Sequence, residues 1–361
     1  MISTALFLLA YLWKSLQAWY FIRWPTLISH TSLNRYPTSS DCAFELRFLQ
    51  AVEAFLIKQN TCLSLNNPED SPQSIRDKIF NLSLQRFQIW WELFDDDARS
   101  DPFEGRFLPP LDILMVWHSY VLSPVSYLED CHRWSKLTLW NHAFPLKLIN
   151  DCIGTSEFDF DAPEIVQRHF TNVSGLDYDF PSSAVDILTP FKEGGSLMSN
   201  SRGIGSNLPS RGVPDKQTYN GNGPWSVDMF HTMRSHCNFI RSGGDLDWIN
   251  KQSTVSTLDF SRNRYLRFLL LHKRYPTEYF VPTWDIDLVW HTHQLWPSNY
   301  RNHHLNYLGH MLDHDITADD SGNVREWKLR TADLWKIEFS EALAQCFCDE
   351  CNAKRHKSSG L

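Results

Sequence analysis

Carboxylate, imidazole and amide side chains are concentrated in residues 280–300, FVPTWDIDLVWHTHQLWPSNY. On a helix, positions i, i+4 and i+7 share a face, and here they are Asp287, His291 and Gln294. Aspartate and histidine bind divalent transition metals, and an aspartate can also orient an imidazole ring. This face is therefore a candidate ligand or metal site. The alternative is a buried histidine that is hydrogen-bonded to aspartate and holds helices together.

His291 and His293 are two residues apart, so a regular helix directs them roughly 200° away from each other. They cannot both bind one metal ion unless the helix is distorted or ends there. Asp287 and His291 are therefore the expected same-face pair. His293 remains a further candidate catalytic residue.

More histidines and aspartates follow in residues 302–315, NHHLNYLGHMLDHD. His310 and His314 are four residues apart, which is a metal-ligand spacing on a helix. Asp313 and Asp315 flank His314. His314 is thus a candidate further ligand, and the alternative is a solvated acidic turn.

The three cysteines near the C-terminus have C-x-C-x-x-C spacing: Cys346, Cys348 and Cys351. Three thiols this close predict a soft-metal site, most often structural zinc, with a fourth ligand from elsewhere, such as His356, His310 or a histidine of residues 280–300. The alternatives are a redox-active thiol cluster or unpaired thiols. The chain's other five cysteines are scattered, and we expect buried thiols there rather than a disulfide scaffold.

Residues 107–127, FLPPLDILMVWHSYVLSPVSY, repeat the frame of residues 280–300 at a constant offset of 173 residues, with ten identities in a gapless window of 21. The shared frame includes Asp112 and Asp285, Trp117 and Trp290, and His118 and His291. At the position of Asp287 the earlier copy has Leu114. At the position of His293 it has Tyr120. A function specific to the second copy is therefore expected at Asp287 and His293.

Prolines bound residues 110–123 and 283–296 in the two copies. Proline suits the first turn of a helix and stops a preceding one, so each copy is expected to be a helix of about 12 residues. Thr283 or Asp285 is the expected N-cap of the second helix, and Asp112 that of the first.

Apolar residues recur at helical spacing elsewhere, and strand-like alternation is scarce. Helices are expected at residues 43–58, 75–94, 163–171, 226–240 and 256–274, with a polar loop at 59–72. The predicted fold class is mainly α, with two pseudo-repeated helical halves that each contain a proline-bounded Trp-His helix.

The 361 residues are enough for two domains. We expect a hydrophobic N-terminal segment at 1–24, a first helical half at 43–182, a flexible Gly/Ser-rich linker at 183–224, and a second helical half with the cysteine cluster at 225–356.

The net charge of −8 argues against direct nucleic-acid binding. A membrane span needs about 20 mostly apolar residues, and Lys14 interrupts the apolar residues 2–22. We expect a cytoplasmic protein. The alternative is membrane contact or anchoring through residues 2–22.

Four ordered segments resemble the glycine-rich domain-containing protein-like family, a domain of unknown function of fungi and plants. They are PPLDILMVWHSYVLSPVSYLEDC at 109–131, VPTWDIDLVWHTHQLWPSNY at 281–300, LDHD at 312–315 and CFCDEC at 346–351. The resemblance covers roughly residues 43–355. It implies a mainly helical domain with an internal repeat, and it implies no particular reaction.

These residues support two hypotheses of different classes. The first is a scaffold or interaction protein with a structural zinc site and a protein partner. The second is a metal-dependent enzyme, a hydrolase or a non-haem iron oxygenase, centred on Asp287 and His291 with His293 or His314. Metal analysis of purified protein separates them.

Overall fold

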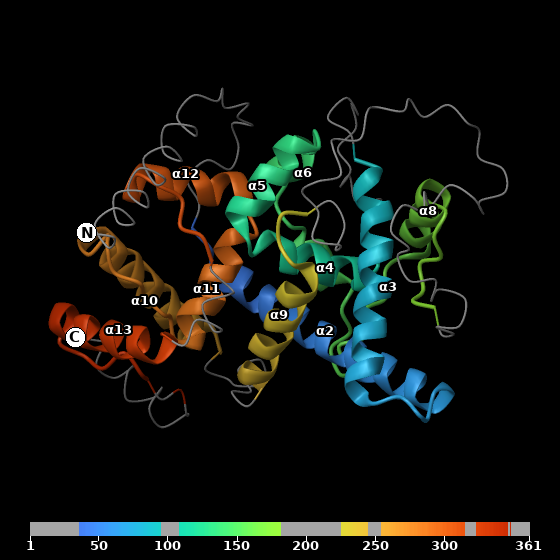
Figure 1. Ribbon diagram of the computed structural model, residues 1–361, viewed down its shortest axis with the longest axis horizontal. Helices are drawn as coiled ribbons and strands as arrows, with labels where there is room; N and C mark the ends of the chain where they lie inside the picture. Colours follow the sequence, from blue (N-terminus) through green and yellow to red (C-terminus); the bar gives the residue numbers. More distant parts are fainter. Residues whose placement is uncertain are drawn as a thin grey trace, which may run out of the picture. The chain divides into compact units, whose positions relative to one another are not determined.

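The computed structural model describes residues 36–94, 108–181, 225–244, 254–314, 323–345 and 347, and it is mainly α-helical (Figure 1). Within these ranges there are twelve helices and no strand, apart from an isolated bridge between Ile153 and Phe160. The predicted mainly α fold class is confirmed. The segment 2–22, the expected linker at 183–224 and the cysteines at 346, 348 and 351 lie outside the described residues, so those predictions stay predictions.

The chain forms two compact units. Of the described residues, one unit, called the α11 unit here, contains 36–42, 141–143, 255–314, 323–345 and 347. The other, the α4 unit, contains 43–94, 108–140, 144–181, 225–244 and 254. In the part of the chain that the structure describes, no helix is long and apolar enough to cross a membrane.

Eight helices lie mainly in the α4 unit. They are α2 (Ser39–Asn66), α3 (Pro72–Glu92), α4 (Leu111–Val121), α5 (Pro124–Arg133), α6 (Leu137–Asn141), α7 (Leu146–Asp151), α8 (Glu164–Ser174) and α9 (Met229–Gly244). All eleven residues of α4 are buried, and this helix packs against α3, α5 and α9. Its high apolar content explains why it forms the centre of the unit.

The α11 unit contains α10 (Thr254–Arg274), α11 (Trp284–Gln294), α12 (Pro297–Leu308) and α13 (Val324–Phe339) (Figure 1). Nine of the eleven residues of α11 are buried, although several of them are polar. Burying polar side chains is costly unless they are hydrogen-bonded. The polar residues of α11 must therefore find partners within the unit.

A buried arginine holds the first turn of each proline-bounded helix. In the α4 unit, Arg86 Nε donates to Asp112 Oδ2 at 2.7 Å. In the α11 unit, Arg264 Nε donates to Asp285 Oδ2, also at 2.7 Å, and a second guanidinium nitrogen donates to the Leu343 carbonyl at 2.6 Å. Because a buried charge is tolerated only when it is paired, each ion pair ties the first turn of its helix to the long helix that carries the arginine.

A matching bond joins each of these helices to the one that follows it. Trp117 Nε1 donates to the Tyr127 hydroxyl at 3.0 Å, and Trp290 Nε1 donates to the Tyr300 hydroxyl at 2.8 Å. The repeated tryptophan and tyrosine thus make the same local contact in both units. The equivalence of the complete halves stays a prediction.

Two local expectations were wrong at helix starts and ends in the α4 unit. Asp112 is not the N-cap of α4, because Pro110 occupies that position and Asp112 faces Arg86 instead. The helix α2 continues to Asn66, so most of the polar loop expected at 59–72 is helical. In the α11 unit, the N-cap of α11 is Thr283, without a side-chain capping bond.

His310 and His314 do not lie on a helix, contrary to expectation. Helix α12 ends at Leu308, and Gly309 follows with a φ of 82° in the left-handed region. Glycine at this position is a common helix stop because it has no Cβ to clash. Residues 311–314 have no regular secondary structure.

Candidate metal centre

The helix α11 presents Asp287 and His291 one turn apart. Their separation of four residues places them on the same face, and Asp287 Oδ1 lies 3.5 Å from His291 Nε2. The ion pair between Arg264 and Asp285 fixes the first turn of this helix just before Asp287.

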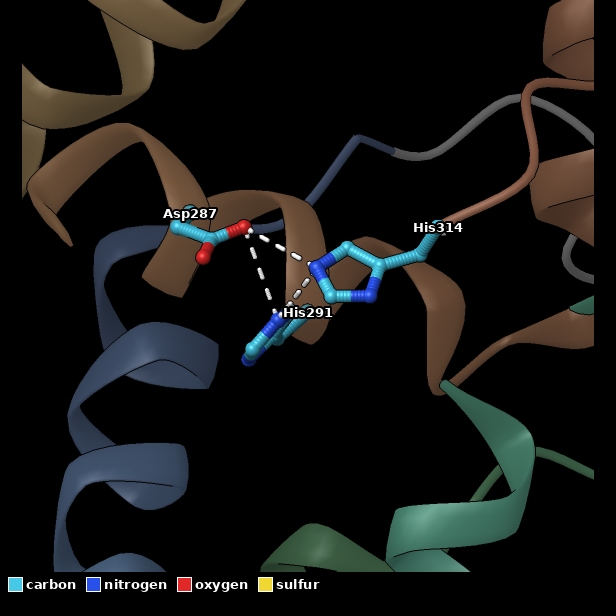
Figure 2. Close-up of side chains that lie close together, drawn as sticks. All are labelled: Asp287, His291 and His314. Atoms are coloured by element: carbon cyan, nitrogen blue, oxygen red, sulfur yellow. Dashed lines mark hydrogen bonds and ion pairs between the residues drawn. The ribbon is translucent and has the colours of Figure 1, made fainter. Parts of the chain in front are cut away.

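His314 reaches the same point from the segment that follows α12. Its Nε2 atom lies 3.4 Å from Asp287 Oδ1 and 3.1 Å from His291 Nε2. Figure 2 shows the three side chains converging, with one oxygen and two nitrogens directed toward one another. The ligand atoms all lie within 4.8 Å of each other, which makes a candidate metal-binding group.

The triangle formed by these three atoms has the size that a transition metal requires. Ligand atoms about 2.1 Å from an ion are roughly 3.4 Å apart in tetrahedral geometry and roughly 3.0 Å apart in octahedral geometry. The observed separations are 3.1, 3.4 and 3.5 Å.

The group is partly accessible to solvent. The His291 side chain is 3% exposed, whereas those of Asp287 and His314 are 18% exposed. The same distances also suit a group without metal, in which one imidazole N–H donates to the other ring or to the carboxylate. Metal binding and a hydrogen-bonded cluster are therefore the two interpretations that an experiment must separate.

His293 does not take part in this group. Its Nδ1 lies 2.9 Å from the Tyr265 hydroxyl, and its Nε2 lies 3.0 Å from His303 Nδ1. Burial, together with the neighbouring His303, lowers the pKa of His293 well below its ordinary value. The ring is therefore neutral and hydrogen-bonded inside the unit, away from Asp287.

The remaining sequence candidates in this region have different surroundings. Gln294 is buried, His310 is half-buried and Asp313 is exposed, and none of them belongs to the group of three. Asp315 lies outside the described residues.

The equivalent histidine of the α4 unit, His118, forms a buried pair with Glu45. Its Nε2 lies 2.7 Å from Glu45 Oε1, and both side chains are fully buried. Burial raises the pKa of Glu45 to about 8 and lowers that of His118 to about 3. The ring of His236 stacks on His118 with centroids 4.4 Å apart. Here the shared histidine is part of the core.

The roles of the buried Arg86, Arg264 and Glu45 were not predicted from the sequence. Arg264 shares its helix face with the buried Ser261 and Phe268, three residues before and four residues after it. A single arginine on the apolar face of an expected helix is a recognisable signal, because such a charge needs a buried partner. The choice of Asp285 as that partner depends on the tertiary structure.

The chain is therefore a mainly helical protein that carries an Asp-His-His group. A family model described as "Glycine-rich domain-containing protein-like" matches residues 249–303, which include Asp287 and His291. This match and the relatives below confirm the resemblance to that family, which the motifs predicted.

Two Arabidopsis thaliana proteins are similar to the chain. It is 27% identical to glycine-rich domain-containing protein 1 over 253 residues, which cover 68% of the chain and 26% of the relative. It is 24% identical to glycine-rich domain-containing protein 2 over 274 residues, which cover 68% of the chain and 28% of the relative. The chain thus spans about a quarter of the length of these curated relatives. No solved structure matches it.

Proposed function

We propose that this protein is a metal-dependent enzyme in which Asp287, His291 and His314 hold one divalent transition-metal ion. The observation that carries the proposal is the spacing of the three ligand atoms, 3.1 to 3.5 Å, in a partly exposed position. Those separations match the ligand-to-ligand distances around an ion of this kind.

The donor set favours particular metals. Two imidazoles and one carboxylate suit zinc and iron(II), whereas magnesium and calcium prefer oxygen ligands. We therefore expect zinc or iron, and we expect magnesium and calcium to compete poorly for the site.

The number of protein ligands favours catalysis over a purely structural role. Structural zinc sites are usually closed by four protein ligands, whereas catalytic sites have three and keep a position for water or substrate. Among the described residues the group has three members. A zinc ion there would lower the pKa of a bound water and supply a nucleophile for hydrolysis, and iron(II) with two histidines and one carboxylate suits oxygenase chemistry.

The scaffold hypothesis remains the alternative. It depends on a structural zinc at Cys346, Cys348 and Cys351, which lie outside the described residues, and on a protein partner. A metal held there would stabilise the fold without an open position.

Metal analysis of the purified full chain tests the proposal. We expect about one zinc or iron per chain at the Asp-His-His group, lost in His291→Ala and retained in Cys348→Ala. If Cys348→Ala loses the metal while His291→Ala keeps it, the scaffold hypothesis replaces the enzyme. If the wild-type chain binds no metal after addition of zinc, iron(II) or cobalt(II), both metal proposals are wrong.

Cobalt(II) substitution tests for an open position. Azide added to the cobalt-loaded chain should change its visible spectrum, because the anion occupies a position that no protein side chain fills. In Cys348→Ala the same change should occur. A spectrum that does not respond to azide would show a closed site and would contradict the enzymatic proposal.

A further inference from the structure

We infer that Tyr300 and His304 are positioning residues of the metal centre, because they hold both backbone groups of Leu312 and so place His314 beside Asp287 and His291. This inference rests on the proposed metal site. Both residues lie on α12, whereas two of the three ligands lie on α11.

Tyr300 connects α11 to the segment that carries His314. Its hydroxyl accepts a hydrogen bond from Trp290 Nε1 at 2.8 Å and donates one to the Leu312 carbonyl at 2.9 Å. The Tyr300 side chain is fully buried, so water does not compete for these bonds. Trp290 lies directly before His291 in α11, and Leu312 lies two residues before His314. One phenol therefore links the two ligand-bearing parts of the chain.

His304 holds the other backbone group of Leu312. The Leu312 N–H donates to His304 Nδ1 at 3.3 Å, and the His304 ring is fully buried. Burial, with several neighbouring histidines, lowers the pKa of His304 well below its ordinary value. The ring is therefore neutral, and its Nδ1 carries the lone pair that this bond requires.

This backbone bond sets the direction of a longer chain of hydrogen bonds. With Nδ1 accepting, His304 carries its proton on Nε2, which lies 3.5 Å from the Tyr265 hydroxyl oxygen. Tyr265 can then donate to His293 Nδ1 at 2.9 Å, and His293 Nε2–H donates to His303 Nδ1 at 3.0 Å. Tyr265 thereby accepts from the ring that holds Leu312, and His293 lies one hydrogen bond further from Leu312.

The positioning matters because residues 311–314 have no regular secondary structure. A ligand on such a segment loses conformational freedom when it binds a metal, and this lost freedom weakens binding. Two buried bonds to Leu312 order the segment beforehand. Removal of residues that orient metal ligands typically weakens metal affinity about tenfold to hundredfold.

The α4 unit provides a matched control. Tyr127 accepts the same indole bond from Trp117, at 3.0 Å. Among the described residues of that unit there is no Asp-His-His group. Tyr127→Phe therefore removes an equivalent hydroxyl and leaves the metal ligands untouched.

The test measures cobalt(II) and zinc affinity of the full chain by titration, using the visible spectrum of cobalt. We expect Tyr300→Phe to weaken affinity about tenfold or more and to change the cobalt spectrum, whereas Tyr127→Phe changes neither. Equal affinities of Tyr300→Phe and the wild-type chain would overturn the inference while leaving the metal site intact. Failure of the wild-type chain to bind either metal would instead overturn the proposed function.

A pair of His304 variants tests the hydrogen bond from the Leu312 N–H to His304 Nδ1. The comparison between them is informative even if both variants lower the unfolding temperature. In His304→Asn, the amide lies near the former Nδ1 and can accept from the Leu312 N–H. In His304→Gln, the amide lies near the former Nε2 and leaves that N–H without its acceptor. We expect tighter cobalt binding by His304→Asn than by His304→Gln, and equal or reversed affinities would contradict the role of His304.

Discussion

His291 Nε2 and His314 Nε2 lie 3.1 Å apart, although 23 residues separate them in the chain and only His291 lies on a helix. This contact brings His314 to Asp287 and His291 of α11 and completes the group of three. The contact depends on how the segment after Gly309 returns to α11. The proposed metal site requires this contact.

We predict that His314→Ala abolishes binding of the metal ion at this site, because it removes one of three ligands. His310→Ala is the matched control, since His310 lies in the same segment but outside the group. Metal content after dialysis, together with cobalt titration, measures the difference. Equal loss in the two variants would indicate a general disturbance of the segment.

We predict that His293→Ala keeps one metal ion per chain but lowers stability. The substitution leaves the buried Tyr265 hydroxyl and His303 without their present partner, which typically costs about 1 to 3 kcal/mol per group. Metal stoichiometry and chemical unfolding report the two effects separately. Complete loss of metal with an unchanged unfolding curve would show that His293 is a ligand instead.

We predict that Asp285→Ala destabilises the α11 unit by about 3 to 5 kcal/mol, because it leaves the Arg264 charge buried and unpaired. Both side chains are almost fully buried, at 1% and 2% exposure. Glu164→Ala is the control, because its pair with Arg168 is exposed and should contribute at most about 0.5 kcal/mol.

Urea unfolding measures both changes, and the double variant Arg264→Met/Asp285→Leu should recover much of the loss. Similar small effects of Asp285→Ala and Glu164→Ala would show that the buried pair contributes little.

The pair of Glu45 and His118 predicts a distinctive dependence of stability on pH. The pKa of Glu45 is raised from 4.5 to about 8, so its contribution is present below pH 4.5 and is lost as the pH rises toward 8. The pKa of His118 is lowered from 6.5 to about 3, so its contribution is present above pH 6.5 and is lost as the pH falls toward 3. The two trends cancel between pH 4.5 and 6.5.

Above pH 6.5 only the contribution of Glu45 still changes with pH. We therefore expect the free energy of unfolding of the α4 unit to fall between pH 6.5 and 8, with the slope that corresponds to a difference of one bound proton between the folded and unfolded chains. The variant Glu45→Gln keeps a neutral hydrogen-bonding side chain and should lack this decline. Urea unfolding across this pH range compares them. Parallel curves for the two chains would show that Glu45 does not titrate as predicted.

Much of the helical framework was accessible from sequence because it depends on local properties. The apolar spacing in residues 256–274 predicted α10 almost to the residue, since one face of that helix is buried. The prolines at 282 and 297 predicted where α11 begins and ends. The spacing of His310 and His314 predicted a helix there, whereas Gly309 ends α12 at Leu308.

Most helices and the pair of Asp287 and His291 follow from the sequence alone, because residues four apart on a helix necessarily share a face. That His314 joins this pair, while His293 contacts Tyr265 and His303, is visible only in the folded chain. Helix formation depends on near neighbours in the chain. The position of His314 instead depends on buried bonds between Leu312 and α12, which no local spacing specifies.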